Sequence, residues 1–224
     1  DIKERKLRFV GCASERLQED YIRALRFLRF WGRGFTPDEE TIKVVNDLSP
    51  MIADFIAPER ISKEIMEKLF YEIDSISFMF KVLHTKLPNL LKTIFPEVYA
   101  TIGVPQNPKF HPEGDVFNHT MKIIGHLAFL GADEMLLLAG LYHDVGKAIT
   151  TTTTNGEIKS HGHDKASVEL TKAFMERNRF SNSTIQRVCG IIEDHMKLHY
   201  DGMKDSSLRR IMAKPYFEDL LLHT

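Results

Sequence analysis

The order of apolar and polar positions predicts a chain built almost entirely of helices. In the most apolar stretch, leucines and a valine recur at near-helical spacing over 137–145, so we expect a helix that is buried on most sides. This helix runs directly into His143 and Asp144, and Gly146 is expected to end it. A buried carboxylate and imidazole are costly without partners, and neutral His nitrogen with ionised Asp oxygen suits a divalent cation. A metal site is one explanation of the pair, but a single His-Asp dipeptide is common by chance, so the case depends on which other residues reach the same point.

Caps and turn residues predict the borders of the other elements. One helix is expected after Ser14 as N-cap, and another after Thr36 as N-cap with Pro37 in its first turn. The threonines of 150–154, a turn of Asn and Gly, and the extended run 157–159 predict a short β-hairpin. Further helices are expected over 75–87, 89–95, 185–197 and 206–213, and others end near residues 70, 130 and 175.

Three prolines between residues 104 and 114 mark a linker, which predicts one domain at 1–105 and a second at 106–224. The chain has 224 residues, of which 43% are hydrophobic and 27% charged, so it is long enough to form a real core. The expected fold class is all-α, with two helical domains and the hairpin near 150–160.

Net charge and cysteine content limit the functional classes. The formal net charge of −1 gives no overall attraction to nucleic acid, so such binding requires a local patch. Cys12 and Cys189 lie far apart without a partner motif, which is typical of reduced thiols in a cytoplasmic protein. No apolar run approaches the length of about 18 residues that spans a membrane. The chain begins with Asp1 rather than Met, and we expect a piece of a longer protein.

Arginines are concentrated near the N-terminus. Residues 1–35 carry nine Lys and Arg against five Asp and Glu, and Arg23, Arg26, Arg29 and Arg33 follow helical steps of three and four. Such a stripe is either a solvated helix face or a set of phosphate contacts.

Asp20 and Arg23 offer a second pair of interpretations. Three residues apart on one expected helix, they present acceptors beside a planar donor group, which could read the edge of a nucleotide base. An internal salt bridge explains the same pair.

One segment near the N-terminus resembles the start of the neck in bacterial tRNA nucleotidyltransferases, which are the class II CCA-adding enzymes and the related poly(A) polymerases. The segment runs from Phe9 to Phe35 and contains the sequence Glu19-Asp20-Tyr21-Ile22-Arg23. The resemblance implies that Asp20 and Arg23 pair with incoming CTP or ATP, that Glu19 supports them and that Arg26 lies near phosphate. It also implies tRNA as a partner. The family's catalytic palm precedes this segment and is not in the sequence, so we expect no nucleotide addition from this chain alone.

Histidines cluster in the second half of the chain. Each alone is more often a polar surface residue, but helical bundles collect metal ligands from several facing helices. The ordered set resembles the HD superfamily of metal-dependent phosphohydrolases, and 114–120, 143–147 and 162–164 match the HD domain fused to tRNA nucleotidyltransferases. The set consists of His119, His143, Asp144, His163 and His195.

The resemblance implies a role for each of these residues. His119, His143 and Asp144 would bind a first metal, while His163 and His195 would bind a second ion or the substrate phosphate. His161 is a rival to His163, which we prefer because the family motif has a Gly-His pair before a helix. Lys147 would face the substrate phosphate as a cation.

The last ligand of the family is an aspartate that follows an apolar helix. Asp219 lies too early in the sequence for that pattern, so we expect the final ligand to be truncated from this chain, which would affect metal affinity and not the fold.

The implied chemistry is hydrolysis of a phosphate ester. A Mg²⁺, Mn²⁺, Ni²⁺ or Co²⁺ ion would polarise the phosphoryl oxygen and lower the pKa of a bound water, which Asp144 would orient. A neighbouring histidine could protonate the leaving oxygen. The family indicates 2′,3′-cyclic phosphates or 2′-nucleotides as substrates. Two alternatives remain: a degenerate HD domain that serves as a non-catalytic RNA-binding module, and a helical protein whose histidines are coincidental.

Overall fold

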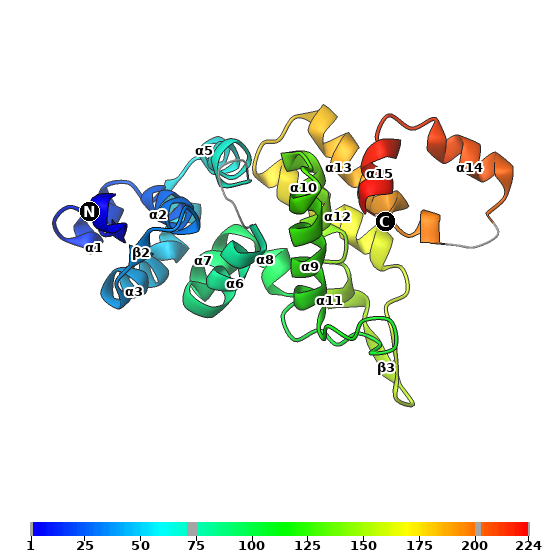
Figure 1. Ribbon diagram of the computed structural model, residues 1–224, viewed down its shortest axis with the longest axis horizontal. Helices are drawn as coiled ribbons and strands as arrows, with labels where there is room; N and C mark the ends of the chain where they lie inside the picture. Colours follow the sequence, from blue (N-terminus) through cyan, green and yellow to red (C-terminus); the bar gives the residue numbers. More distant parts are fainter. Residues whose placement is uncertain (1, 71–75, 200–202, 224) are drawn as a thin grey trace. The chain divides into compact units, whose positions relative to one another are not determined.

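A computed structural model describes residues 2–70, 76–199 and 203–223 (Figure 1). These residues are mainly helical, as expected, and their strands form two short pairs. The chain divides into two compact units, Asp1–Tyr99 and Ala100–Thr224. The prolines of the sequence had suggested a border at residue 105.

The first unit is a bundle of short helices, several of which begin at a proline. Proline is favoured in the first turn because its missing N–H has no partner there in any helix. The described elements are η1 (Ile2–Glu4), β1 (Lys6–Leu7), α1 (Ala13–Glu19), α2 (Arg23–Gly32), β2 (Thr36–Pro37), α3 (Glu39–Leu48), η2 (Ser49–Met51), α4 (Ile52–Phe55), α5 (Pro58–Glu64), η3 (Ile65–Phe70), α6 (Ile76–Lys86), α7 (Pro88–Ile94) and α8 (Pro96–Tyr99).

Three expectations for this unit were wrong. Ser14 does not cap a helix, because α1 begins at Ala13 and Cys12 occupies the N-cap position. Thr36 does not cap a helix, because its backbone pairs with Lys6 in a parallel bridge; Asp38 caps α3 instead, accepting from Thr41 N–H at 2.7 Å. The N-terminal helix is also broken. Asp20 has extended backbone angles (φ −159°, ψ 99°), so α1 ends at Glu19 and α2 begins at Arg23.

The second unit is organised around α10 (Glu134–Tyr142), which is buried on every side from Leu136 to Tyr142. It packs against α9 (Val116–Phe129), α13 (Asn182–Asp194) and α15 (Phe217–His223). The remaining described elements are α11 (Lys147–Thr150), β3 (Thr152–Thr154), β4 (Glu157–Lys159), α12 (His163–Arg177), η4 (Lys197–His199) and α14 (Asp205–Met212).

The predicted hairpin is confirmed. Strands β3 and β4 are antiparallel, and Asn155 and Gly156 at the turn both have positive φ (52° and 79°), as a tight hairpin turn requires. In Figure 1 the hairpin projects away from the helices of its unit.

Gly146 has a different function from the one expected. Helix α10 ends at Tyr142, and Gly146 has an ordinary helical φ of −62° at the start of α11. A Cβ atom here would lie 2.3 Å from the carbonyl oxygen of His163 and 2.6 Å from the backbone nitrogen of Ser167. The glycine therefore lets this turn approach the backbone of α12 closely.

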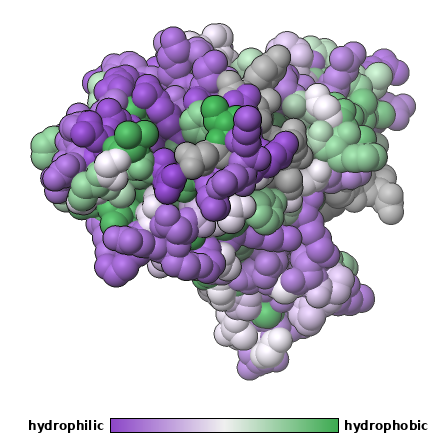
Figure 2. Space-filling view, turned by 60° about the vertical axis from the view of Figure 1, so that its left-hand side comes forward, coloured by the Kyte–Doolittle hydropathy of each residue, from purple (hydrophilic) through white to green (hydrophobic). Residues whose placement is uncertain are grey.

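Surface polarity is uneven on a small scale. On the face drawn in Figure 2, hydrophilic residues predominate and apolar residues gather in separate groups. Within the described part of the chain, no helix combines the length and the apolar composition that crossing a bilayer requires.

Candidate metal centre

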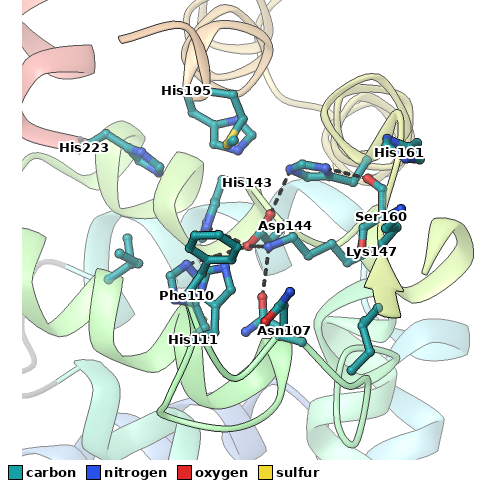
Figure 3. A pocket seen from close by; sticks show the side chains of 17 residues that line it. Asn107, Phe110, His111, His143, Asp144, Lys147, Ser160, His161, His195 and His223 are labelled. Carbon is teal, nitrogen blue, oxygen red and sulfur yellow. Dashed lines mark hydrogen bonds and ion pairs between the residues drawn. The ribbon is translucent and has the colours of Figure 1, made fainter. Parts of the chain in front are cut away.

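Helix ends bring the five predicted ligands together in the second unit. His143, Asp144 and His195 are labelled in Figure 3. His119 lies in the first turn of α9, His143 and Asp144 directly follow α10, and His163 opens α12. His195 directly follows α13, whereas the sequence had placed it inside that helix.

The histidines are oriented by the backbone at these helix ends. His143 Nδ1 donates to the carbonyl oxygen of Gly140 at 2.8 Å, and His195 Nδ1 donates to that of Ile192 at 2.6 Å. The last carbonyls of a helix lack intrahelical partners, so they are available as acceptors. His163 Nδ1 donates in the same way to Ser160 at 2.8 Å. In the neutral form of each ring, this places the proton on Nδ1 and leaves the lone pair on Nε2, as is usual for metal-binding imidazoles.

Asp144 is the point on which these groups converge. Its Oδ2 lies 3.1 Å from His143 Nε2 and 3.7 Å from His119 Nε2, while its Oδ1 lies 3.3 Å from His163 Nε2. Two sets of possible ligands share this carboxylate: His119 with His143, and His163 with His195. The arrangement could hold two ions with Asp144 between them, or one ion and a phosphate.

Several buried polar atoms at the centre have no hydrogen-bond partner within the described part of the chain. They are Asp144 Oδ1, the Nε2 atoms of His163 and His195, and both ring nitrogens of His223. Burying such an atom unsatisfied costs roughly 1–3 kcal/mol, and a bound cation would satisfy the lone pairs. Imidazole nitrogen and carboxylate oxygen are ligands that Zn²⁺, Ni²⁺, Co²⁺ and Mn²⁺ accept. The residues present therefore fit a divalent metal.

Burial and neighbouring charges shift the pKa values of several ligands toward the forms that bind a cation. Burial, together with the nearby His143, lowers the pKa of His119 and of His195 to about 4, so both imidazoles are neutral at pH 7. Burial by itself would raise the pKa of Asp144, but His143, Lys147 and His195 outweigh it and hold that pKa well below its ordinary value. Neutral imidazoles and an ionised carboxylate are the forms that bind metals.

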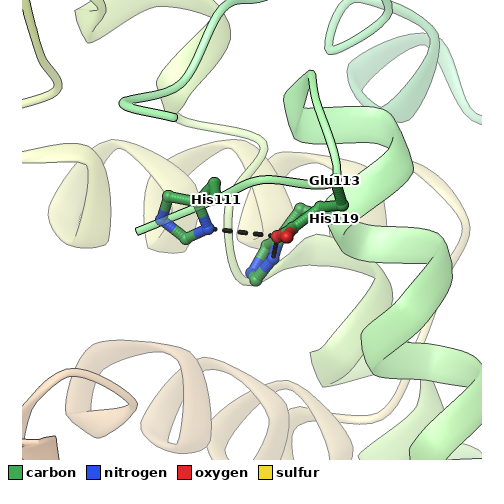
Figure 4. Close-up of side chains that lie close together, drawn as sticks. All are labelled: His111, Glu113 and His119. Atoms are coloured by element: carbon green, nitrogen blue, oxygen red, sulfur yellow. Dashed lines mark hydrogen bonds and ion pairs between the residues drawn. The ribbon is translucent and has the colours of Figure 1, made fainter. Parts of the chain in front are cut away.

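A carboxylate that the sequence did not single out supports His119 (Figure 4). Glu113 Oε1 accepts from His119 Nδ1 at 2.7 Å and from His111 Nδ1 at 3.2 Å. Burial opposes ionisation of Glu113, but hydrogen bonds from its own backbone N–H and from His119 and His111 lower its pKa to about 2. A carboxylate behind a ligating imidazole orients the ring and makes it more basic.

Lys147 is buried beside Asp144. Its Nζ donates to Asp144 Oδ2 at 2.7 Å and to Gln106 Oε1 at 2.9 Å. The ammonium group compensates the buried carboxylate and also lines the cavity in front of it. Its expected contact with substrate phosphate stays a prediction.

Other residues that the sequence had offered as possible ligands lie outside the two ligand sets. His161 is exposed at the edge of the cavity and belongs to neither ligand set, whereas His163 belongs to one. Asp219 accepts from Arg187 Nε and Nη2, both at 2.8 Å, and does not join the ligand sets. His223 of α15 also lies outside the ligand sets, but it lines the same cavity, and nothing in the sequence indicated this.

The centre opens into a cavity of about 750 Å³. Its inner end is formed by the metal-site residues and Lys147, and its walls include Ile123 and Ile158. Phe110, with 68% of its surface exposed, lines the same cavity, and Figure 3 shows its ring in front of Asp144. A polar end and an apolar wall are typical of a site for a small organic molecule.

In the first unit, Asp20 and Arg23, which were expected to pair with a nucleotide base, have separate partners. Arg23 Nη1 donates to Glu19 Oε2 at 3.0 Å, and Arg60 Nη2 donates to Asp20 Oδ2 at 3.1 Å. Because the backbone breaks at Asp20, the expected common helix face for Asp20 and Arg23 is wrong. Arg23 and Arg26 line a small cavity of about 190 Å³ together with three phenylalanines and Arg8.

Comparison with known proteins identifies the second unit. Residues 116–214 match the HD domain family. HD domains are metal-dependent, in agreement with the ligand sets around Asp144.

Similarity extends over most of the chain to proteins named Multifunctional CCA protein. The protein from Thioalkalivibrio sulfidiphilus is 36% identical over 188 residues, 82% of this chain and 44% of the relative. Those from Shewanella denitrificans and Burkholderia vietnamiensis are 32% and 35% identical and cover 89% of this chain and 47% of each relative. The chain thus spans about half the length of these relatives. The HD domain and these matches together are consistent with the C-terminal part of a CCA-adding enzyme, which confirms the predicted resemblance.

Proposed function

We propose that the chain acts as part of a tRNA nucleotidyltransferase in the addition or repair of the CCA end of tRNA. Within it, the second unit hydrolyses a phosphate ester of the 2′,3′-cyclic phosphate or 2′-nucleotide class. The observation that supports the hydrolase most directly is the convergence of four histidines on Asp144, with buried Nε2 and carboxylate atoms that have no hydrogen-bond partner among the described residues. We also propose a cytoplasmic location.

Each residue of the centre has a part in this proposal. His119, His143 and Asp144 hold one metal ion, and His163 and His195 hold a second ion or the substrate phosphate. A bound ion supplies Lewis acidity toward the phosphoryl oxygen and a more acidic water. Asp144 orients the water, and Lys147, held in place by Gln106, neutralises charge on the phosphate.

The first unit selects the nucleotide in this proposal. Glu19 holds one amino group of the Arg23 guanidinium at 3.0 Å, which restricts its plane and leaves other donors for a base. Arg60 likewise orients Asp20. Asp20 and Arg23 would pair with CTP or ATP, and Arg26 would lie near phosphate.

Metal binding and hydrolysis test the second unit together. The chain is stripped with a chelator, titrated calorimetrically with Mn²⁺ or Ni²⁺, and assayed on 2′,3′-cAMP. We expect binding and hydrolysis, both lost in Asp144→Ala and both kept in His126→Ala, which changes an exposed histidine of α9. Absence of metal binding and of hydrolysis in the unmodified chain would contradict the proposal. RNA binding that persists without either activity would favour the alternative of a non-catalytic RNA-binding module.

Nucleotide selection is tested in a longer protein that includes a palm domain. Asp20→Ala should reduce the discrimination between CTP and ATP, whereas Asp54→Ala, an exposed aspartate of α4, should leave it unchanged. Unchanged selectivity in Asp20→Ala would refute the role of Asp20 in pairing with the incoming nucleotide.

A further inference from the structure

His223, the final residue of α15, is a buried histidine with an exposed fraction of 7%. Among the residues that the structure describes, neither of its ring nitrogens has a hydrogen-bond partner. The other histidines of the centre differ, because each uses Nδ1 to donate to a backbone carbonyl or to Glu113. A neutral imidazole has one donor and one acceptor, and leaving both unsatisfied in the interior is unfavourable. Something other than the described protein groups is therefore expected to bind this ring.

The surroundings of His223 indicate what that group is. Its ring centroid lies 4.9 Å from that of His143 and 5.8 Å from that of His195, and it lines the same cavity. Figure 3 shows His223 on the side of the centre where His143 and His195 lie. An additional imidazole beside two possible ligands, with no acceptor of its own, has the chemistry of a metal ligand.

Two ionic anchors hold the segment that delivers His223. Arg187 of α13 donates to Asp219 of α15 through two nitrogens at 2.8 Å and to Asp133, the N-cap of α10, at 2.7 Å. This fork fixes α15 against both helices that end in ligands.

The second anchor fixes the stretch before α15. Asp194, fully buried next to His195, accepts from Lys197, from Lys214 and, at 3.1 Å, from the Tyr216 hydroxyl. The Tyr216 ring also packs against Gly190 so closely that a Cβ there would lie 2.5 Å from it. Residues 203–223 are thus an arm that is docked onto α13 at two places before it reaches the centre.

We propose that His223 is a further metal ligand of this centre, on the side of His143 and His195, and that metal binding stabilises the docked arm. The inference depends on the proposed metal site. By thermodynamic linkage, a ligand that the arm supplies makes the docked state more favourable when metal is bound.

Calorimetric titration of the metal-free chain with Mn²⁺ or Co²⁺ tests this assignment. His223→Ala should weaken metal binding at least tenfold and change the visible spectrum of the Co²⁺ form, while His126→Ala should do neither. Arg187→Ala should also weaken binding, because it releases α15 without touching the centre. Affinity within twofold of the unmodified chain, with an unchanged spectrum, would overturn the proposal, as would an increase in KM for substrate with no change in metal affinity.

A second measurement avoids any variant that fails to fold. In the unmodified Co²⁺-bound chain, NMR should detect hyperfine-shifted ring protons that are assigned to His223. Their absence, when those of His143 are present, would refute the ligand role. If the unmodified chain binds no metal at all, the proposed metal site itself fails, which is a distinct result.

Discussion

Replacing Gly146 with alanine should show whether chain entropy or close packing dominates at this position, because the two predict opposite changes in stability. Its φ of −62° is one that any residue adopts, so chain entropy alone predicts that Gly146→Ala stabilises the protein by about 0.4–1 kcal/mol. The tertiary contacts predict the opposite. A new Cβ would lie 2.3 Å from His163 O and 2.6 Å from Ser167 N, and backbone atoms of a helix cannot rotate away. Such overpacking typically costs about 1–3 kcal/mol, and we expect the upper end.

The same substitution should disturb the metal site. Relief of the clash moves the start of α12 away from the turn after α10, which separates His163 from Asp144 and lengthens the 2.9 Å hydrogen bond from Gly146 N–H to Ser167 Oγ. Urea unfolding of the metal-free chain measures stability, and Mn²⁺ titration measures the affinity, which should fall.

Gly156→Ala is the matched control. Gly156 has a φ of +79° with no atom near a new Cβ, so this change should cost roughly 1–2 kcal/mol of backbone strain and leave metal affinity unchanged. A Gly146→Ala protein that is as stable as the original, or more so, and that binds Mn²⁺ equally well would refute the packing argument.

Three further outcomes are expected. Asp38→Ala should lower the free energy of unfolding by about 1 kcal/mol at pH 7, because it removes the N-cap of α3. Hydrogen bonds from Thr41 lower the pKa of Asp38 in the folded state, so its contribution to stability is complete above the ordinary pKa of 3.8. Urea unfolding at a series of lower pH values should show the difference between the two proteins disappear as the pH falls through the lowered pKa of the folded state. Iodoacetamide at pH 8 should modify Cys12 much faster than Cys189, because a hydrogen bond from Ser14 lowers the pKa of the exposed Cys12 thiol whereas burial raises that of Cys189 to about 11; equal rates by mass spectrometry would contradict this. Phe110→Ala should raise KM for nucleotide phosphates and leave KM for ribose 5-phosphate unchanged if the exposed ring stacks on a base; equal effects on both substrates would exclude stacking.

Local rules accounted for much of this protein. Helix borders follow from caps such as Asp115 and Asp133, which bind backbone N–H groups three residues ahead, and the hairpin follows from Asn155 and Gly156. These signals act between residues close in sequence, so they can be read without knowing the fold. The histidines could be ordered into a candidate site because their spacing matched a known domain.

Other features depend on residues that are distant in the chain. Thr36 is extended because it pairs with Lys6, and Asp20 is oriented by Arg60, which lies on a different helix. Local patterns contain no information about such partners, so the predicted cap at Thr36 and the common face of Asp20 and Arg23 were wrong.

The centre itself combines both kinds of information. The types of residue that suit a metal are present in the sequence at 119, 143, 144, 163 and 195. Packing decided that Gly146 lets α12 come close enough to place His163 beside Asp144, that Glu113 supports His119, and that α15 brings His223 to the same point. The sequence therefore determines which side chains can bind a metal. The distances between those side chains depend on which helices pack together, and only the tertiary structure determines that.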